Sequence, residues 1–232
     1  MGLALGCSVL IATPSYAVPY SWTNWESAIN DPGGNLGSAA GMLEGVSVTF
    51  SGNVTAPTQV SGGIPYWDTF PATYAGGVVG NGPSPNSDII ALTTGPGTQT
   101  LTFLSPVVDP AMAILSLGRA GVPVSYDFGT TTFTVLNKGA GFFDLPNAGS
   151  LSPAILSTGS ILTGEEGHGL IQFSGTFDST TPITWTVSNF EFWHGFTVGV
   201  ASTNVPEPAS LMLLGAGLAA IGIWRRKAAA KG

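Results

Sequence analysis

Short runs in which apolar and polar residues alternate are the feature of this sequence that most limits its fold. Apolar side chains occupy every second position in the runs 46–50, 101–103, 122–128 and 183–187, and in 192–200 with the exception of His194. Because successive side chains of a β-strand point to opposite faces of the sheet, this period is typical of strands with one buried face. The pattern predicts an all-β protein with about nine short strands and no long helix between them.

The residues between these runs favour turns, as at Ser61-Gly-Gly, Asn81-Gly-Pro, Gly95-Pro-Gly and Asn137-Lys-Gly. Residues 111–117 form a more continuous apolar run, which is typical of a central strand. Hydrophobic residues make up 44% of the chain, which is enough for a packed core despite 33 Gly and 17 Pro. We therefore expect residues 18–204 to form one antiparallel β-sandwich of jelly-roll or immunoglobulin-like type.

Two segments near the start of this domain depart from the strand pattern. Trp22, Trp25 and Ile29 are spaced i, i+3, i+7, which predicts a short helix. Residues 55–87 are rich in Gly, Pro and Asn, and we expect them to form long loops.

Charge is scarce in this chain and unevenly distributed. Charged residues make up 8%, against roughly 25% in an ordinary soluble domain. Four of the six basic residues lie at the C-terminal tip, so residues 18–204 carry two basic residues and twelve carboxylates, a net charge of 2 − 12 = −10. Such a domain lacks the basic patch that binding to phosphates requires, and we expect no nucleic-acid partner.

The N-terminus has the pattern of an export signal. An apolar run over 3–12 is followed by Pro14 and by small residues up to Ala17, although no Lys or Arg precedes the run. This predicts a signal peptide over 1–17 that is cut between Ala17 and Val18; the alternative is a buried N-terminal strand or helix. Cys7, the single cysteine, would be removed with it, which excludes disulfides and thiolate metal ligands from the remaining domain.

The C-terminus has a more specific pattern. Pro206, Glu207 and Pro208 form a segment that cannot join a helix, and an apolar run over 209–224 follows. At 1.5 Å per residue this run spans roughly 24 Å, close to the ~30 Å hydrocarbon core of a membrane. The basic cluster of Arg225, Arg226 and Lys227 should stop transfer and stay on the cytoplasmic side. We expect a transmembrane helix over 209–224.

Motif, apolar helix and basic tip, in this order, resemble the PEP-CTERM sorting signal, and the resemblance is confined to residues 205–232. It implies recognition of Pro206, Glu207 and Pro208 by an exosortase, a membrane-embedded cysteine transpeptidase. It also implies transient anchoring in the inner membrane of a Gram-negative bacterium during export, and a final place on the cell surface or in the extracellular matrix. The alternative is a permanent single-span anchor.

One polar cluster and one histidine are candidates for chemistry in the middle domain. Glu165, Glu166 and His168 lie in a Gly-rich segment that could offer oxygen ligands to a structural Ca²⁺; the alternative is a solvated turn between strands. His194 lies in register with Phe192 and Phe196, on the apolar side of its strand, and we interpret it as a hydrogen-bonded core histidine. We expect no other cofactor.

Aromatic residues offer a different kind of site. Tyr66 and Trp67 lie in the expected loop region, and Trp193 lies on the strand face opposite Phe192 and Phe196, so exposed rings could bind glycans. No Gly-x-Ser-x-Gly nucleophile motif is present, and nothing selects the pair of carboxylates that a glycosidase needs. We therefore expect a structural, biofilm-associated and non-catalytic surface protein. The alternatives are a carbohydrate-binding module for extracellular polysaccharide and a secreted hydrolase.

Overall fold

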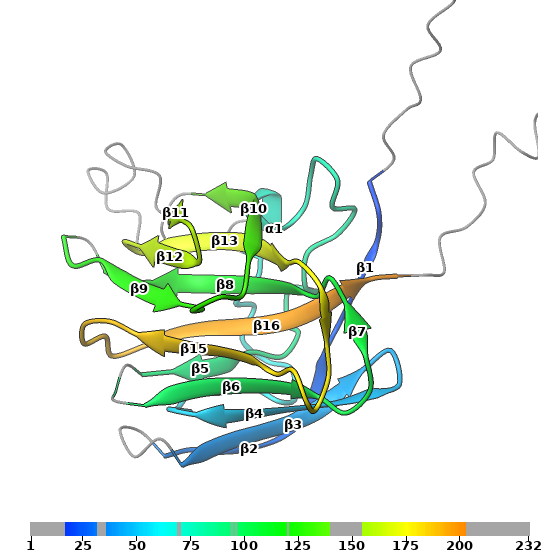
Figure 1. Ribbon diagram of the computed structural model, residues 1–232, viewed down its shortest axis with the longest axis horizontal. Helices are drawn as coiled ribbons and strands as arrows, with labels where there is room; N and C mark the ends of the chain where they lie inside the picture. Colours follow the sequence, from blue (N-terminus) through cyan, green and yellow to red (C-terminus); the bar gives the residue numbers. More distant parts are fainter. Residues whose placement is uncertain are drawn as a thin grey trace, which may run out of the picture. The chain divides into compact units, whose positions relative to one another are not determined.

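The computed structural model describes residues 17–31, 36–68, 71–93, 95, 97–119, 121–139 and 155–202. It confirms the all-β fold, because antiparallel strands make up nearly all of the regular structure (Figure 1). The predicted signal peptide up to residue 16, the motif at Pro206 and the apolar run over 209–224 lie outside the described residues. Within the described part of the chain, no helix is long and apolar enough to cross a membrane.

Most strands belong to two sheets. The six-stranded sheet runs in the order β1 (Tyr20–Trp22), β16 (His194–Ala201), β8 (Ala111–Leu117), β13 (Gly167–Phe173) and β10 (Phe133–Gly139), and β5 (Ile90–Leu92) also pairs with β16. The eight-stranded sheet runs in the order β11 (Ile155–Thr158), β12 (Ile161–Gly164), β9 (Val124–Asp127), β15 (Ile183–Val187), β6 (Thr98–Phe103), β4 (Val46–Gly52), β3 (Gly37–Leu43) and β2 (Asn24–Ile29). A separate pair joins β7 (Val107–Val108) to β14 (Thr176–Phe177).

The two large sheets pack face to face through an aromatic core. Phe196 of the six-stranded sheet lies 5.1 Å from Phe50 and 5.7 Å from Trp185, measured between ring centroids, and both partners belong to the eight-stranded sheet. These edge-to-face contacts continue a single buried cluster that draws residues from both sheets. The inward half of each alternating run fills this core, as expected for a sandwich.

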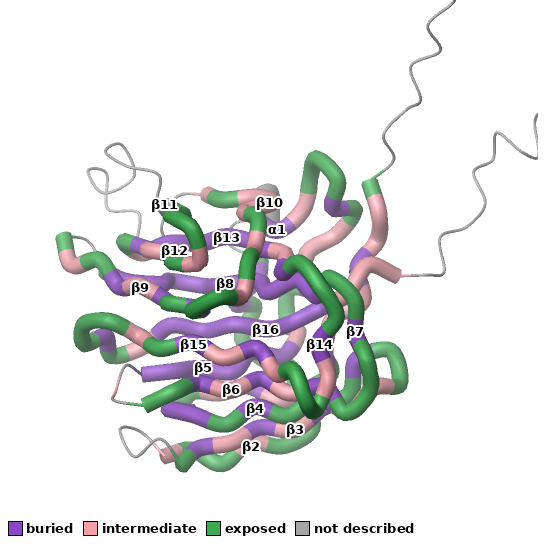
Figure 2. Tube along the Cα trace, in the orientation of Figure 1, coloured by how far each residue is buried: buried purple, intermediate pink, exposed green. Residues whose placement is uncertain are grey.

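The six-stranded sheet is buried on both faces. All seven residues of β8 are buried (Figure 2), including Ala111 and Leu115, which point away from the aromatic core. A second cluster, in which Trp67 and Tyr74 from the segment before β5 take part, covers that outer face. The expected loop region 55–87 therefore acts as a packed cover, and its one described helix is the short α1 (Pro71–Tyr74). This cover explains why 111–117 is continuously apolar, and the prediction of a central strand is confirmed.

The predicted helix at Trp22, Trp25 and Ile29 is wrong. These residues lie in β1 and β2, where a bulge between Trp25 and Ser27 breaks the period of two. Trp25 is buried, its backbone N–H donates to Asp88 Oδ2 at 2.9 Å, and its indole N–H donates to Thr197 Oγ1 at 3.1 Å. Ile29 is exposed, so the helical spacing is a coincidence of the bulge.

Three smaller expectations are also corrected. Asn137-Lys-Gly forms no turn, because the segment continues β10 and pairs with β13 as far as Gly139↔His168. Phe192 precedes β16 and is exposed, so it does not share the buried face of His194 and Phe196. The described residues hold sixteen strands rather than about nine, because several are short or built from small residues, as β3 is.

Candidate functional site

The acidic cluster predicted from the sequence is divided by the fold. Glu165 and Glu166 form the turn between β12 and β13, as the turn alternative expected, but His168 lies fully buried inside β13. His168 Nδ1 lies 2.9 Å from the Tyr74 hydroxyl, and that hydroxyl donates to the Ile114 carbonyl at 3.0 Å. Among the described residues no group of three or more acidic, histidine or cysteine side chains could hold a metal ion.

Glu166 is occupied by a contact within the fold. Its Oε2 accepts a hydrogen bond of 2.6 Å from the hydroxyl of Ser116, whose backbone has a φ of 57° at the end of β8. Burial raises the pKa of the Glu166 carboxyl, and the hydrogen bond from Ser116 opposes this effect. The carboxylate thus stabilises the kinked end of β8 and does not face a ligand together with Glu165.

Of the aromatic rings proposed for glycan binding, Tyr66 and Trp67 are buried and Trp193 is half-buried. Trp67 is buried and packs edge-to-face on Tyr74, with ring centroids 5.1 Å apart. Tyr66 stacks on Trp193 at 5.6 Å with an interplanar angle of 26°, so each ring covers a face of the other. The assumption that Tyr66 and Trp67 are accessible is therefore wrong: the segment before β5 covers the six-stranded sheet, and its aromatic side chains anchor it there.

A buried carboxylate that the sequence analysis missed lies beside His194. Glu191 Oε2 lies 3.0 Å from His194 Nδ1 and accepts a 2.9 Å hydrogen bond from the backbone N–H of Gly118. Burial raises the pKa of the Tyr126 hydroxyl well above its usual range, and the negative charge of the Glu191 carboxylate raises this pKa further. The interpretation of His194 as a core histidine is confirmed, since it is fully buried. The sequence feature that could have predicted this pair is the single Glu three residues before His194, which lies within a run of aromatic residues.

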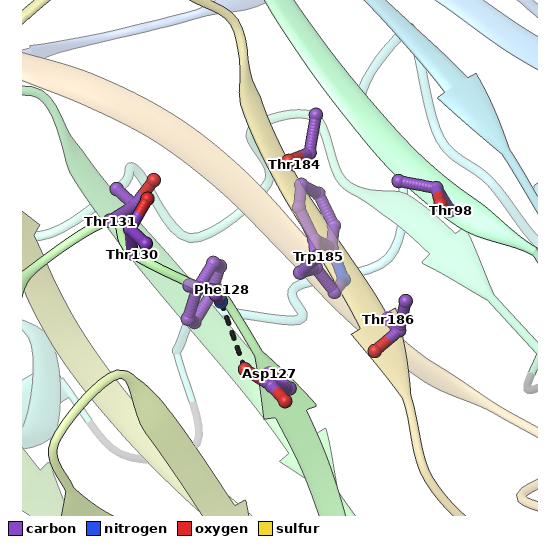
Figure 3. Close-up of a pocket in the computed structure, with 9 residues that line it drawn as sticks. Thr98, Asp127, Phe128, Thr130, Thr131, Thr184, Trp185 and Thr186 are labelled. Carbon is purple, nitrogen blue, oxygen red and sulfur yellow. Dashed lines mark hydrogen bonds between the residues drawn. The ribbon is translucent and has the colours of Figure 1, made fainter.

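The surface has its own site, a hollow in the outer face of the eight-stranded sheet (Figure 3). It has a volume of about 480 Å³ and is open to solvent. We call it the threonine hollow, because hydroxyls from β6, from β15 and from the turn after β9 surround it. Its lining consists of Thr98, Asp127, Phe128, Gly129, Thr130, Thr131, Thr184, Trp185 and Thr186.

The threonine hollow continues into rows of hydroxyls on the same face. In the strand register Thr184 pairs with Thr100, which pairs in turn with Ser51, and Thr102 pairs with Thr49. These residues are the polar half of the alternating runs, so they point away from the aromatic core. The sequence carries this signal as Thr at every second position of 98–102, but only strand pairing shows that the rows adjoin.

Comparison with family models matches residues 204–227 to the PEP-CTERM protein-sorting motif. The tail of this chain is a PEP-CTERM motif. The matched range includes Pro206, Glu207 and Pro208 and the basic residues Arg225, Arg226 and Lys227. The match confirms the resemblance seen in the sequence. A PEP-CTERM motif targets an exported protein to an exosortase and carries it through a membrane-anchored stage. No curated protein and no solved structure matches the chain.

Proposed function

We propose that this exosortase-targeted protein is a non-catalytic structural component of the extracellular matrix. The observation that carries the proposal is the burial of the carboxylate–histidine pair that the fold brings together, Glu191 and His194. Glu191 and His194 are 4% and 0% exposed, and Glu191 is bonded to the backbone of Gly118. A general acid or base must come within hydrogen-bond distance of its substrate, and this pair lies inside the core.

The outward surface supports the same proposal. Hydroxyl side chains occupy the outward positions of β4, β6 and β15 in the eight-stranded sheet, and residues 18–204 contain only Arg119 and Lys138 as basic residues. A rigid sandwich with an uncharged hydroxyl face suits lasting contact with a hydrated polymer network.

Processing is tested by mass spectrometry of the protein from its native cells. We expect an N-terminus at Val18 and the loss of the chain that follows the Pro206 region, with the mature protein in the matrix fraction. The matched variant carries Pro206→Ala, Glu207→Gln and Pro208→Ala, and should keep its tail and stay in the membrane fraction. An intact tail on the wild-type protein would contradict exosortase processing and leave a permanent anchor.

The non-catalytic part is tested separately, by incubating the purified protein with neutral exopolysaccharide from the same bacterium. We expect no increase in reducing ends over time, with a glycosidase as the positive control. New reducing ends that disappear in Glu191→Gln would contradict the proposal and indicate a hydrolase.

A further inference from the structure

We propose that the threonine hollow binds a neutral polysaccharide chain. The inference rests on the proposed function and names the partner of the matrix protein. It also moves the binding surface to the outer face of the eight-stranded sheet, away from Tyr66, Trp67 and Trp193.

The hollow exists because two neighbouring strands diverge. β15 pairs with β6 from Ile183 to Thr186, but with β9 only at Thr186↔Asp127 and Val187↔Tyr126. β9 ends at Asp127, and the chain then turns at Gly129, whose φ is 62°. Space is therefore left beside Thr184, opposite the turn after β9 (Figure 3).

The walls of the hollow are held in place by the core. Phe128 and Trp185 line it and are almost fully buried, and their ring centroids lie 5.8 Å apart. The turn itself is closed by the backbone N–H of Gly129, which donates to Asp127 Oδ1 at 2.9 Å. A site that is already formed loses little conformational entropy on binding. The free energy of weak hydrogen bonds to a ligand is therefore not offset by the cost of ordering the site.

The lining matches the chemistry of a sugar. Five threonine hydroxyls can each donate and accept, as the hydroxyls of a sugar do, and β-branched threonine has few rotamers to lose. The Asp127 carboxylate can accept from two adjacent sugar hydroxyls. The threonine methyl groups add apolar area for the C–H faces of a sugar, while Phe128 and Trp185 support the hollow from the core.

Charge selects a neutral ligand. Asp127 is the one charged residue of the lining, and it disfavours a uronate or a sulfate. The net charge of −10 over residues 18–204 acts in the same direction. A polycation would need several carboxylates, whereas the neighbouring rows offer hydroxyls.

The ligand is a chain rather than a single sugar, because the hydroxyl surface extends beyond the hollow. The Thr184, Thr100 and Ser51 row crosses three strands, and adjacent strands in a sheet lie about 4.8 Å apart. One sugar can occupy the hollow while the next ones lie along the rows of β6 and β4.

The test is affinity electrophoresis of the full chain in a detergent without a sugar headgroup. The probes are hydroxyethylcellulose, dextran and the neutral exopolysaccharide of the producing bacterium, with alginate as the anionic comparison. We expect retention by at least one neutral probe and none by alginate. The triple variant Thr98→Val, Thr184→Val, Thr186→Val keeps the side-chain shapes, and should bind about tenfold more weakly or worse, since three hydrogen bonds are lost. Thr134→Val, an exposed threonine on β10, is the matched control and should bind as the wild type does.

Footprinting of the wild-type protein by hydroxyl radicals keeps the test independent of whether the triple variant folds. With the retained probe, we expect protection of 127–131 and 184–186.

Three results would each overturn the proposal. One is no retention by any neutral probe. Another is an about tenfold loss of polysaccharide binding in Phe192→Ala together with unchanged binding in the triple variant. That result would place the site at the exposed Phe190 and Phe192 pair. The third is self-association that the triple variant abolishes without any change in retention, which would assign the face to a second copy. Neither assay requires exosortase processing, so failure here is distinguishable from failure of the proposed function.

Discussion

At the scale of single residues, the buried polar groups stabilise the fold through specific partners. The Tyr74 hydroxyl has one proton and donates it to the Ile114 carbonyl, so His168 Nδ1 carries the hydrogen that the hydroxyl oxygen accepts. Burial lowers the pKa of His168 to about 4. The imidazole is therefore neutral in the folded protein at pH values where an unfolded chain would already protonate it.

This difference predicts acid sensitivity. An unfolded histidine titrates near pH 6.5, so below that pH the unfolded state binds more protons than the folded state, and stability falls until about pH 4. We expect wild type to lose on the order of 2 kcal/mol from this group between pH 7 and pH 5. His168→Gln should be less stable at pH 7 but lack this part of the pH dependence. Urea unfolding at both pH values measures it, and identical pH slopes in the two proteins would refute the assignment.

Calcium provides a second test at this scale. Because Glu166 accepts from Ser116 and His168 faces Tyr74, Glu165 remains as the member of the predicted cluster exposed in the turn. A Ca²⁺ site needs six or more oxygen ligands. We expect calorimetric titration with Ca²⁺ to give no binding heat and no rise in melting temperature, and a clear rise would restore the metal site.

At the scale of elements, the pairing of β2 with β3 shows what a bulge does to a sequence pattern. The register shift between Trp25 and Ser27 lets Trp25 reach Thr197 in the other sheet. It also brings the backbone of β2 against Gly41 of β3, where a Cβ would clash with the Asn24 carbonyl oxygen and lie 2.8 Å from Trp25 Cα.

Gly41→Ala should therefore cost about 2–4 kcal/mol of unfolding free energy, because the atoms that the new Cβ would meet are backbone atoms of β2 and cannot move aside easily. Gly62→Ala is the control, since its Cβ would meet only Asn86 O at 3.5 Å, and should change stability by less than about 0.5 kcal/mol. Denaturant unfolding compares the two. Equal stability of both variants would show that β2 does not approach Gly41 so closely.

At the scale of the whole molecule, the charge distribution divides the chain into an acidic domain and a basic tip. With a net charge of −10 over residues 18–204, the exported part should repel polyanions once the tail is removed. The mature protein should thus pass through a heparin column at about 0.05 M NaCl. Its retention by neutral polysaccharide should change less than about twofold up to about 0.5 M NaCl, since hydroxyl contacts are not screened. Binding to heparin, or salt-sensitive retention, would contradict this account of the surface.

The sequence by itself determined the features that depend on local pattern. The alternating runs indicated strands, 111–117 indicated a central strand, and Pro206-Glu207-Pro208 with its basic tip indicated the sorting motif. It could not determine register, because a bulge such as that at Trp25 shifts which side chains face the core without changing composition.

Only the tertiary structure decided which residues meet. Glu191 reaches Gly118 across 73 positions, His168 reaches Tyr74 across 94, and Tyr66 and Trp67 are buried because their segment covers a sheet formed far away in the chain. The threonine hollow likewise depends on β9 and β15 diverging after two residue pairs. The physical reason is that these contacts are non-local. Strand order and sheet packing determine them, and the alternation of apolar and polar residues within one strand contains no information about strand order or sheet packing.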